Sequence, residues 1–269
     1  MLKKLTIDGC QLEYEVHGAG EPAVLIHGSA LADTYLPILS EPSLSSFKLV
    51  RYRRRGFGES THPASIISIS DQANDCWALM RELNIARAHI AGHSYGGAIA
   101  LQLALDHPEE VHSLALLEPA LIRFVPNAAE FMGALAPVME THRKGDRREA
   151  LEGFFLQVAG PDWRKSFDAL PGSLEMALAD IDNLFRVEIP AIGEWRFTRD
   201  DAGRIHQPIL AVVGAESAPV FHEIHELVQS WFSHAKPVTI PRTNHMLQAV
   251  EPRALAEVLA NFWNKVPMR

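Results

Sequence analysis

The sequence is poor in three features that would restrict its class: cysteine, positive charge and long apolar runs. Its two cysteines, Cys10 and Cys76, lie far apart, which argues against a disulfide framework and favours a reducing compartment. The net charge of −8 argues against nucleic acid as a partner, because phosphates require a basic face. No signal-peptide pattern and no apolar run of about 18 residues occurs, so we expect a cytoplasmic protein without a membrane partner.

The sequence does contain a regular alternation of strand-like and helical segments. Short apolar runs predict strands, and apolar residues at helical spacing between them predict helices. Asp8-Gly9 between the first two runs is a strong signal for a tight hairpin. This alternation is typical of an α/β fold with a mainly parallel, doubly wound sheet and helices on both faces. The predicted strands cover residues 2–7, 11–17, 23–26, 48–52, 87–91, 111–117, 207–214 and 236–240.

A long stretch in the middle of the chain shows helical periodicity without a clear strand. Within it, apolar residues such as Leu151 and Phe155 recur at helical spacing, and Gly/Pro pairs divide the stretch into pieces. We interpret residues 119–205 as a helical cap, or lid, inserted into a core domain formed by residues 1–118 and 206–269. Such a cap would lie over the strand ends, restrict water and shape a substrate pocket.

The most informative motif is Gly-His-Ser-Tyr-Gly-Gly at residues 92–97, which follows a predicted strand and opens a helical run. A serine on such a sharp turn has strained backbone geometry, and small neighbours let the turn close. We therefore predict that Ser94 is a nucleophile. The N–H groups of Tyr95 and Ser29, the latter in the loop after strand 23–26, would stabilise the oxyanion, at about 2.7–4 kcal/mol for each donor.

A histidine near the end of the chain, His245, follows the last predicted strand and is the natural general base. With it, the sequence resembles the α/β-hydrolase superfamily over nearly its whole length. The motifs that carry the resemblance are His27-Gly28, residues 55–60 (Arg-Gly-Phe-Gly-Glu-Ser), the turn at Ser94 and the late His245, in that family's order. The resemblance implies the fold and a Ser-His-acid triad, but it is much less specific for the substrate.

The acidic member of the triad departs from the commonest pattern of this superfamily. Most members place an aspartate three residues beyond the glycine that ends the late strand, here Gly214, where this sequence has Ser217. Two carboxylates keep the chain order: Glu118, after the strand that follows the turn helix, and Glu216. We favour Glu118, because certain members use this strand end and because an unpaired carboxylate closing an apolar run is costly. Ser217, with Pro219 after it, has the pattern of a helix N-cap.

Arginines at positions 51, 53, 54 and 55 form the densest charge cluster of the chain. The superfamily often has an aspartate where Arg53 stands. We interpret the cluster as structural ion pairs or a solvated loop rather than as a site for an anionic substrate.

Together these residues predict a serine hydrolase that cleaves a small carboxylic ester or lactone through an acyl-enzyme. Carbon–carbon bond hydrolysis or a lyase reaction on the same triad is the alternative, and a non-catalytic ligand-binding protein of this fold is a less favoured one. We expect no cofactor, and no metal because the thirteen histidines do not fall in a ligand spacing. The sequence leaves a monomer and a homodimer open.

Overall fold

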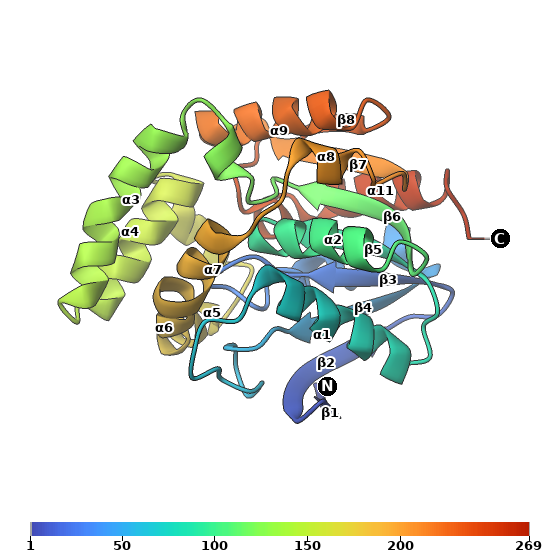
Figure 1. Ribbon diagram of the computed structural model, residues 1–269, viewed down its shortest axis with the longest axis horizontal. Helices are drawn as coiled ribbons and strands as arrows, with labels where there is room; N and C mark the ends of the chain where they lie inside the picture. The colour runs from blue at the N-terminus through green and yellow to red at the C-terminus, as the bar shows by residue number, and fades with distance from the viewer. Residues whose placement is uncertain (1, 269) are drawn as a thin grey trace.

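The computed structural model describes residues 2–268, which form one eight-stranded sheet in the order β1-β2-β4-β3-β5-β6-β7-β8 (Figure 1). β2 pairs antiparallel with β1 and β4, and the neighbouring pairs from β4 to β8 are parallel. The predicted mainly parallel α/β class is confirmed. The strands are β1 (Lys3–Ile7), β2 (Cys10–His17), β3 (Glu21–Ile26), β4 (Phe47–Arg53), β5 (Ala88–His93), β6 (Val111–Leu117), β7 (Ile209–Gly214) and β8 (Lys236–Ile240).

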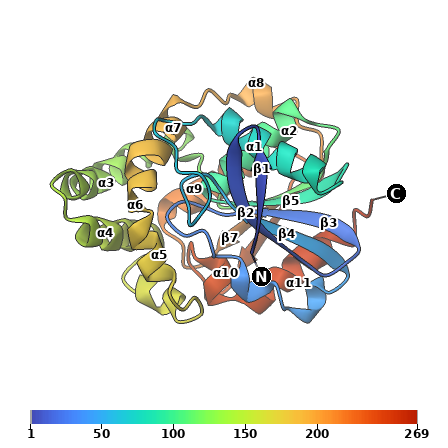
Figure 2. The same cartoon turned by 90° about the horizontal axis from the view of Figure 1, so that it is seen from below.

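Apolar side chains of the central strands alternate between two cores, one on each face of the sheet. In β3, Val24 and Ile26 join one core, whereas Ala23 and Leu25 join the other. Because both faces are buried, these strands read as continuous apolar runs. Figure 2 shows α1 and α2 on one side of the sheet and α10 and α11 on the other. The helices of the main domain are α1 (Ile69–Glu82), α2 (Tyr95–Asp106), α9 (Pro219–Trp231), α10 (Leu247–Val250) and α11 (Pro252–Trp263), with short turns η1 (Leu36–Ile38) and η2 (Pro42–Leu44).

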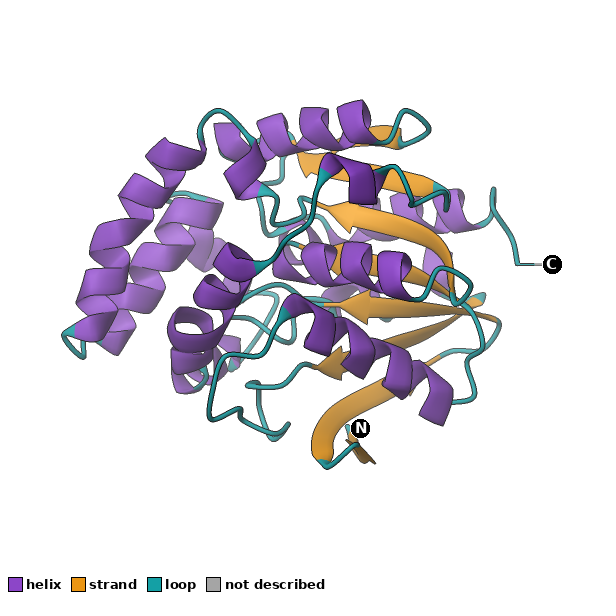
Figure 3. Cartoon of the chain, in the orientation of Figure 1, coloured by secondary structure: helices purple, strands orange, loops and turns teal. Residues whose placement is uncertain are grey.

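Residues 119–208, which we call the inserted helical segment, connect β6 to β7 and contain helices and loops but no strand. Figures 1 and 3 show α3 to α7 beyond the carboxyl ends of the parallel strands, where the α3–α4 hairpin forms the outermost part. In parallel α/β sheets that edge is the place for ligands. The elements are η3 (Ile122–Phe124), α3 (Ala128–Arg143), α4 (Arg147–Ala159), η4 (Trp163–Phe167), α5 (Ser173–Ala179), α6 (Ile181–Asn183), η5 (Leu184–Glu188), α7 (Ile189–Glu194) and α8 (Arg199–Ala202).

The hairpin between β1 and β2 has the geometry that its sequence indicates. Asp8 and Gly9 both have positive φ, 47° and 80°, which is what a two-residue type I′ turn requires. Elsewhere, Cys10 and Cys76 are free and buried. Of the helices within residues 2–268, none has the length and apolar character needed to cross a membrane.

Candidate active site

Ser94 occupies a strained turn between β5 and α2. Its φ of 52° and ψ of −118° lie outside the regions that L-residues commonly adopt. The turn depends on glycines, since a Cβ at Gly92 would lie 2.4 Å from the carbonyl oxygen of Gly96, and one at Gly96 would lie 2.2 Å from that of Ile26. The Ser94 N–H donates to the carbonyl of Leu117 in β6 at 2.9 Å. The surrounding sheet therefore holds the serine in its unusual conformation.

Two residues that the sequence predicted as backbone donors, Ser29 and Tyr95, line the same cavity as Ser94. Tyr95 is the first residue of α2, where an N–H has no carbonyl one turn earlier to bond to and the helix dipole favours negative charge. Ser29 lies in the loop after β3. Ser29, Tyr95, Ser94 and His245 line one cavity, so the structure brings together four residues that the sequence predicted to act together.

The loop that carries Ser29 is anchored by the buried Arg54. The Arg54 guanidinium donates to the carbonyls of His27 at 3.2 Å and Gly28 at 2.9 Å, and its peptide N–H donates to Nε2 of His27 at 3.1 Å. Burial, helped by the charge of Arg54, holds the pKa of His27 well below its usual value. The neutral ring can thus accept at Nε2 while Nδ1 donates to the Gly28 carbonyl at 2.8 Å.

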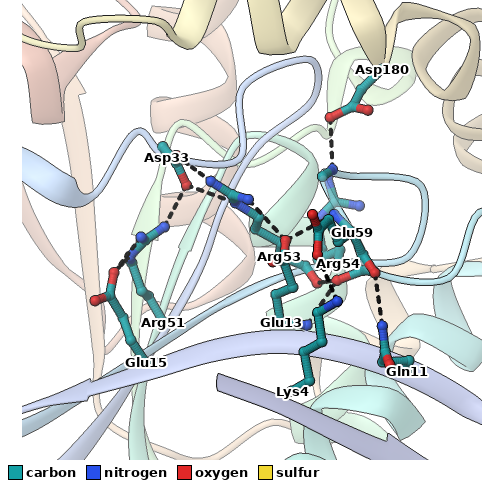
Figure 4. A network of polar contacts seen from close by, with 12 residues as sticks. Lys4, Gln11, Glu13, Glu15, Asp33, Arg51, Arg53, Arg54, Glu59 and Asp180 are labelled. Atoms are coloured by element: carbon teal, nitrogen blue, oxygen red, sulfur yellow. Dashed lines mark hydrogen bonds and ion pairs between the residues drawn. The ribbon is translucent and has the colours of Figure 1, made fainter. Parts of the chain in front are cut away.

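Further along the same loop, Asp33 joins a buried network of ion pairs with β4 and β2 (Figure 4). Its carboxylate lies 2.5 Å from Arg51 and 2.8 Å from Arg53, and Arg53 also pairs with Glu13 at 2.8 Å. Burial raises the pKa of Asp33, but the hydrogen bond from Arg53 and the charges of both arginines outweigh it and leave the pKa below its usual value. The ion-pair interpretation of Arg53 is confirmed.

Glu118 follows β6 directly, with a positive φ of 46°, and is buried with 1% of its surface exposed. Its Oε2 lies 2.5 Å from Nδ1 of His245. Its Oε1 accepts hydrogen bonds from the N–H of Gly214 at 2.7 Å and from the hydroxyl of Ser217 at 2.5 Å. Both carboxylate oxygens are therefore bonded, as a buried charge requires.

The structure places the other candidate acid differently. Glu216 is exposed, and within residues 2–268 no hydrogen bond or ion pair to its carboxylate is found. The N-cap prediction for Ser217 is wrong, because α9 has Ala218 at its N-cap and no side-chain cap. The physical reason is competition: the buried Glu118 carboxylate takes the Ser217 hydroxyl, so the residue in the usual acid position supports the acid on the neighbouring strand.

Two rings hold His245 in place. Phe221 stacks on it with ring centres 4.0 Å apart, and Nε2 of His93 donates to the His245 carbonyl at 2.8 Å. Burial, and to a smaller extent the proximity of His245, lowers the pKa of His93 well below its usual value. His93 is therefore a neutral donor. This contact joins residues 152 positions apart, so the sequence alone did not reveal it.

The cavity above Ser94 has a volume of about 210 Å³ and is walled mainly by apolar side chains of the inserted helical segment. Glu188 and Arg123 are the charged groups of that segment among its lining residues. Phe131 and Met132 of α3, and Trp195 directly after α7, also line it. Trp195 is buried, whereas Met132 is 43% exposed, so the walls of the cavity include side chains that reach solvent.

A model of the alpha/beta hydrolase fold family matches residues 22–252. The chain belongs to this family. The match extends from β3 through the inserted helical segment to the start of α11, so it covers every element that lines the cavity. A hydrolase is the coarse functional class that this membership supports, and the bond that is cleaved must be argued from the site.

The names of the relatives of this alpha/beta hydrolase refer to different activities. A stretch of 106 residues, 39% of this chain and 40% of the relative, is 33% identical to a protein of Azorhizobium caulinodans named for carbamate hydrolysis. A second relative, an acetyltransferase component of an acetoin cleaving system from Pseudomonas putida, is 26% identical over 94% of this chain and 66% of its own length. The chain thus spans only part of both.

Solved structures show the same fold over the full chain. A thermophilic esterase from Thermogutta terrifontis superposes with a TM-score of 0.84 at 20% identity, covering all of both chains. Est816, described as an N-acyl homoserine lactone degrading enzyme, has a TM-score of 0.74 at 24% identity, covering 97% of this chain and 100% of its own.

Proposed function

We propose that this alpha/beta hydrolase cleaves a small carboxylic ester or lactone through an acyl-enzyme on Ser94. The observation that carries the proposal is one cavity faced both by the strained Ser94 and by His245, whose Nδ1 is bonded to the buried Glu118. A serine in a strained turn, a base and an acid that orients the base are the parts that nucleophilic acyl transfer needs.

In the proposed reaction, His245 accepts the proton of Ser94 Oγ through Nε2 as the oxygen attacks the carbonyl carbon. The N–H groups of Ser29 and Tyr95 hold the oxygen that becomes negative. His245 then gives the proton to the departing alcohol oxygen. In the second half, His245 takes a proton from water, the hydroxide oxygen attacks the acyl carbon, and Ser94 regains its proton as the acid leaves.

Glu118 supports this cycle through the tautomer of His245. Because its carboxylate accepts from Nδ1, the proton of a neutral imidazole is held there, and Nε2 keeps its lone pair for the Ser94 hydroxyl. The positive charge that forms on the ring in the transition state lies against the same carboxylate. Glu216, which is exposed, has no such contact.

We further propose that residues 119–205 act as a cap over a core domain made of residues 1–118 and 206–269. The inserted helical segment supplies most of the apolar walls of the cavity, which lowers the local dielectric and strengthens the oxyanion contacts. A cavity of about 210 Å³ is small for a ligand site, so short acyl chains fit best. The fold shared with an esterase and a lactone-degrading enzyme is compatible with this substrate class.

Labelling with a fluorophosphonate, combined with turnover of p-nitrophenyl esters and γ-lactones, tests the proposal. Ser94→Ala should lose the label and reduce kcat by about 10⁶, the loss seen when such a nucleophile is removed. Ser230→Ala, a change of an exposed serine on α9, is the matched control and should keep both label and activity. Label on Ser94 without ester or lactone turnover would instead indicate carbon–carbon bond cleavage or a lyase reaction, and unchanged activity in Ser94→Ala would refute the mechanism.

A further inference from the structure

Glu188 enters the cavity from an irregular turn of the inserted helical segment. It is the last residue of η5, a π-helical turn in which the N–H of Ile189 bonds to the carbonyl of Leu184, five residues earlier. Pro190 follows, and its ring has no N–H and would crowd the carbonyl of Arg186 in a regular helix. The wider turn accommodates the proline. Such π turns occur frequently at functional sites.

The two oxygens of Glu188 are not equivalent. Oε1 lies 2.5 Å from the guanidinium of Arg54, and only 1% of the Glu188 surface is exposed. Oε2 is also buried but has no hydrogen-bond partner within residues 2–268. An unmet buried acceptor costs about 1–3 kcal/mol, and native proteins keep few of them. Because Glu188 lines the cavity, a ligand in that cavity is the available source of a donor.

The charges around Glu188 indicate which kind of donor fits. Arg54 already compensates the carboxylate, and other N–H groups of its guanidinium bond to Gln72 at 2.6 Å and to the carbonyls of His27 and Gly28. A second cation, Arg123, also lines the cavity. An ammonium group would therefore add a positive charge beside a carboxylate that Arg54 already neutralises, with Arg123 lining the same cavity. A neutral hydroxyl or amide N–H satisfies Oε2 without that cost.

We propose that Glu188 Oε2 accepts a hydrogen bond from an uncharged hydroxyl or amide N–H on the acyl part of the substrate. This inference rests on the proposed ester or lactone hydrolysis and narrows its substrate class to donor-bearing acyl groups. A site built to bond a substrate donor rejects the analogue that lacks it, because the buried acceptor is then left unpaired.

Isosteric pairs of p-nitrophenyl esters test the inference. One pair is the 3-hydroxybutyrate and the 3-methylbutyrate esters, which exchange a hydroxyl for a methyl group. The other is the N-acetylglycinate and the 4-oxopentanoate esters, which exchange N–H for CH₂. In the wild type we expect kcat/KM to favour the donor-bearing member of at least one pair about tenfold, and to disfavour the 3-ammoniobutyrate ester.

Glu188→Gln should bring that ratio close to one. The glutamine carbonyl can keep the contact with Arg54, and its NH₂ then meets the substrate donor where an acceptor stood. A ratio measured within one variant is independent of its folded fraction. Glu194→Gln, the same change at an exposed position of α7, is the matched control and should keep the wild-type ratio.

The outcomes separate the inference from the proposed function. If all esters are hydrolysed with equal kcat/KM within each pair, or if Glu188→Gln keeps a donor preference, the inference is refuted while ester hydrolysis stands. If no ester is hydrolysed, the proposed function fails, and calorimetric binding of the intact pairs to Ser94→Ala decides the inference. A tenfold donor preference that is lost in Ser94→Ala/Glu188→Gln supports it, and equal or absent binding overturns it. Should Glu188→Gln not fold, the wild-type ratios decide.

Discussion

Two glutamates of the candidate site, Glu118 after β6 and Glu188 in the inserted helical segment, are equally buried, with 1% of each surface exposed. Every oxygen of Glu118 has a protein partner: His245 on one side, Gly214 and Ser217 on the other. Glu188 has a partner on one oxygen only. The first arrangement fixes a side chain in one role, and the second keeps a bonding position open for an external group.

The partners of the two glutamates also come from different parts of the fold. The partners of Glu118 are Gly214 at the end of β7, Ser217 in the loop after β7 and His245 in the loop after β8, so all three lie at the carboxyl ends of parallel strands. Glu188 reaches back from the inserted helical segment to Arg54 just after β4. We infer that the sheet edge carries the reaction chemistry and that the inserted segment selects the substrate.

The largest loss of activity is expected for Glu118→Gln, which tests the role of the fully bonded glutamate. A glutamine can keep an oxygen toward Gly214 and Ser217, but its NH₂ toward Nδ1 of His245 favours the tautomer with a proton on Nε2, which cannot accept the Ser94 proton. We expect kcat to fall about 10⁴-fold, as in a comparable triad, with the fold retained. Steady-state kinetics on p-nitrophenyl acetate and thermal unfolding measure both.

Glu216→Gln serves as the control for that variant, because it changes an exposed carboxylate just after the neighbouring strand β7. It should leave kcat within about twofold, since isolated surface charges have small effects. A large loss of kcat in Glu216→Gln together with a small one in Glu118→Gln would assign the acid role to Glu216. The bonded carboxylate of Glu118 would then have no role in the reaction.

A second test asks whether two buried histidines, His27 in the loop after β3 and His93 beside His245, stay neutral in the folded chain. The pKa values of His27 and His93 lie well below the usual value because of burial. As the pH falls below about 6.5, the unfolded chain therefore binds protons that the folded chain excludes, and the free energy of unfolding decreases.

Urea unfolding of the wild type and of His93→Gln at about pH 7.5 and 5.5 measures this effect. Glutamine keeps a donor for the carbonyl of His245 but does not titrate. The decrease in unfolding free energy on acidification should be smaller in the variant, by on the order of 1 kcal/mol, because one excluded proton is missing. Equal decreases in both proteins would show that His93 takes up a proton in the folded state.

A smaller loss of kcat is expected when Ser217 is changed, because only one contact of Glu118 is then removed. Ser217→Ala removes one of three hydrogen bonds to the Glu118 carboxylate and makes that glutamate more like Glu188. Bonds to charged groups contribute about 1.5–3 kcal/mol, and part of this remains available from water, so we expect a tenfold loss of kcat, equivalent to about 1.4 kcal/mol. Ser217→Thr, which keeps the hydroxyl, should recover most of the activity in the same assay, whereas equal losses in both variants would point to packing.

Much of the fold could be predicted from the sequence because it depends on local patterns. Apolar runs placed the strands at 111–117 and 236–240 with the bounds that the structure has, and Asp8-Gly9 predicted the first hairpin. The turn at Ser94 was equally visible, since the glycines that it needs are its immediate neighbours. Glu118 was found by a longer argument, from its place at a strand end and the cost of burying it unpaired.

The rest depends on contacts between distant parts of the chain. The interaction of Ser217 with Glu118 joins residues 99 positions apart, and nothing in the local N-cap pattern reveals that a carboxylate competes for the hydroxyl. Glu188 belongs to no motif, and its π turn breaks the 3.6-residue periodicity on which helix predictions rely. Pro190 was the one visible signal of that irregularity.

The buried pair of Arg54 and Glu188 has a consequence for how this pocket can evolve or be redesigned. Arg54 also holds the carbonyls before Ser29, so the turn that carries Glu188 is tied to the loop that carries Ser29. The α3–α4 hairpin contributes the apolar walls Phe131, Leu135 and Phe154 from outside that linkage. We therefore expect that substitutions on the hairpin change the tolerance for longer acyl chains, while the preference for a polar substituent on the substrate stays unchanged. The two properties can be adjusted separately.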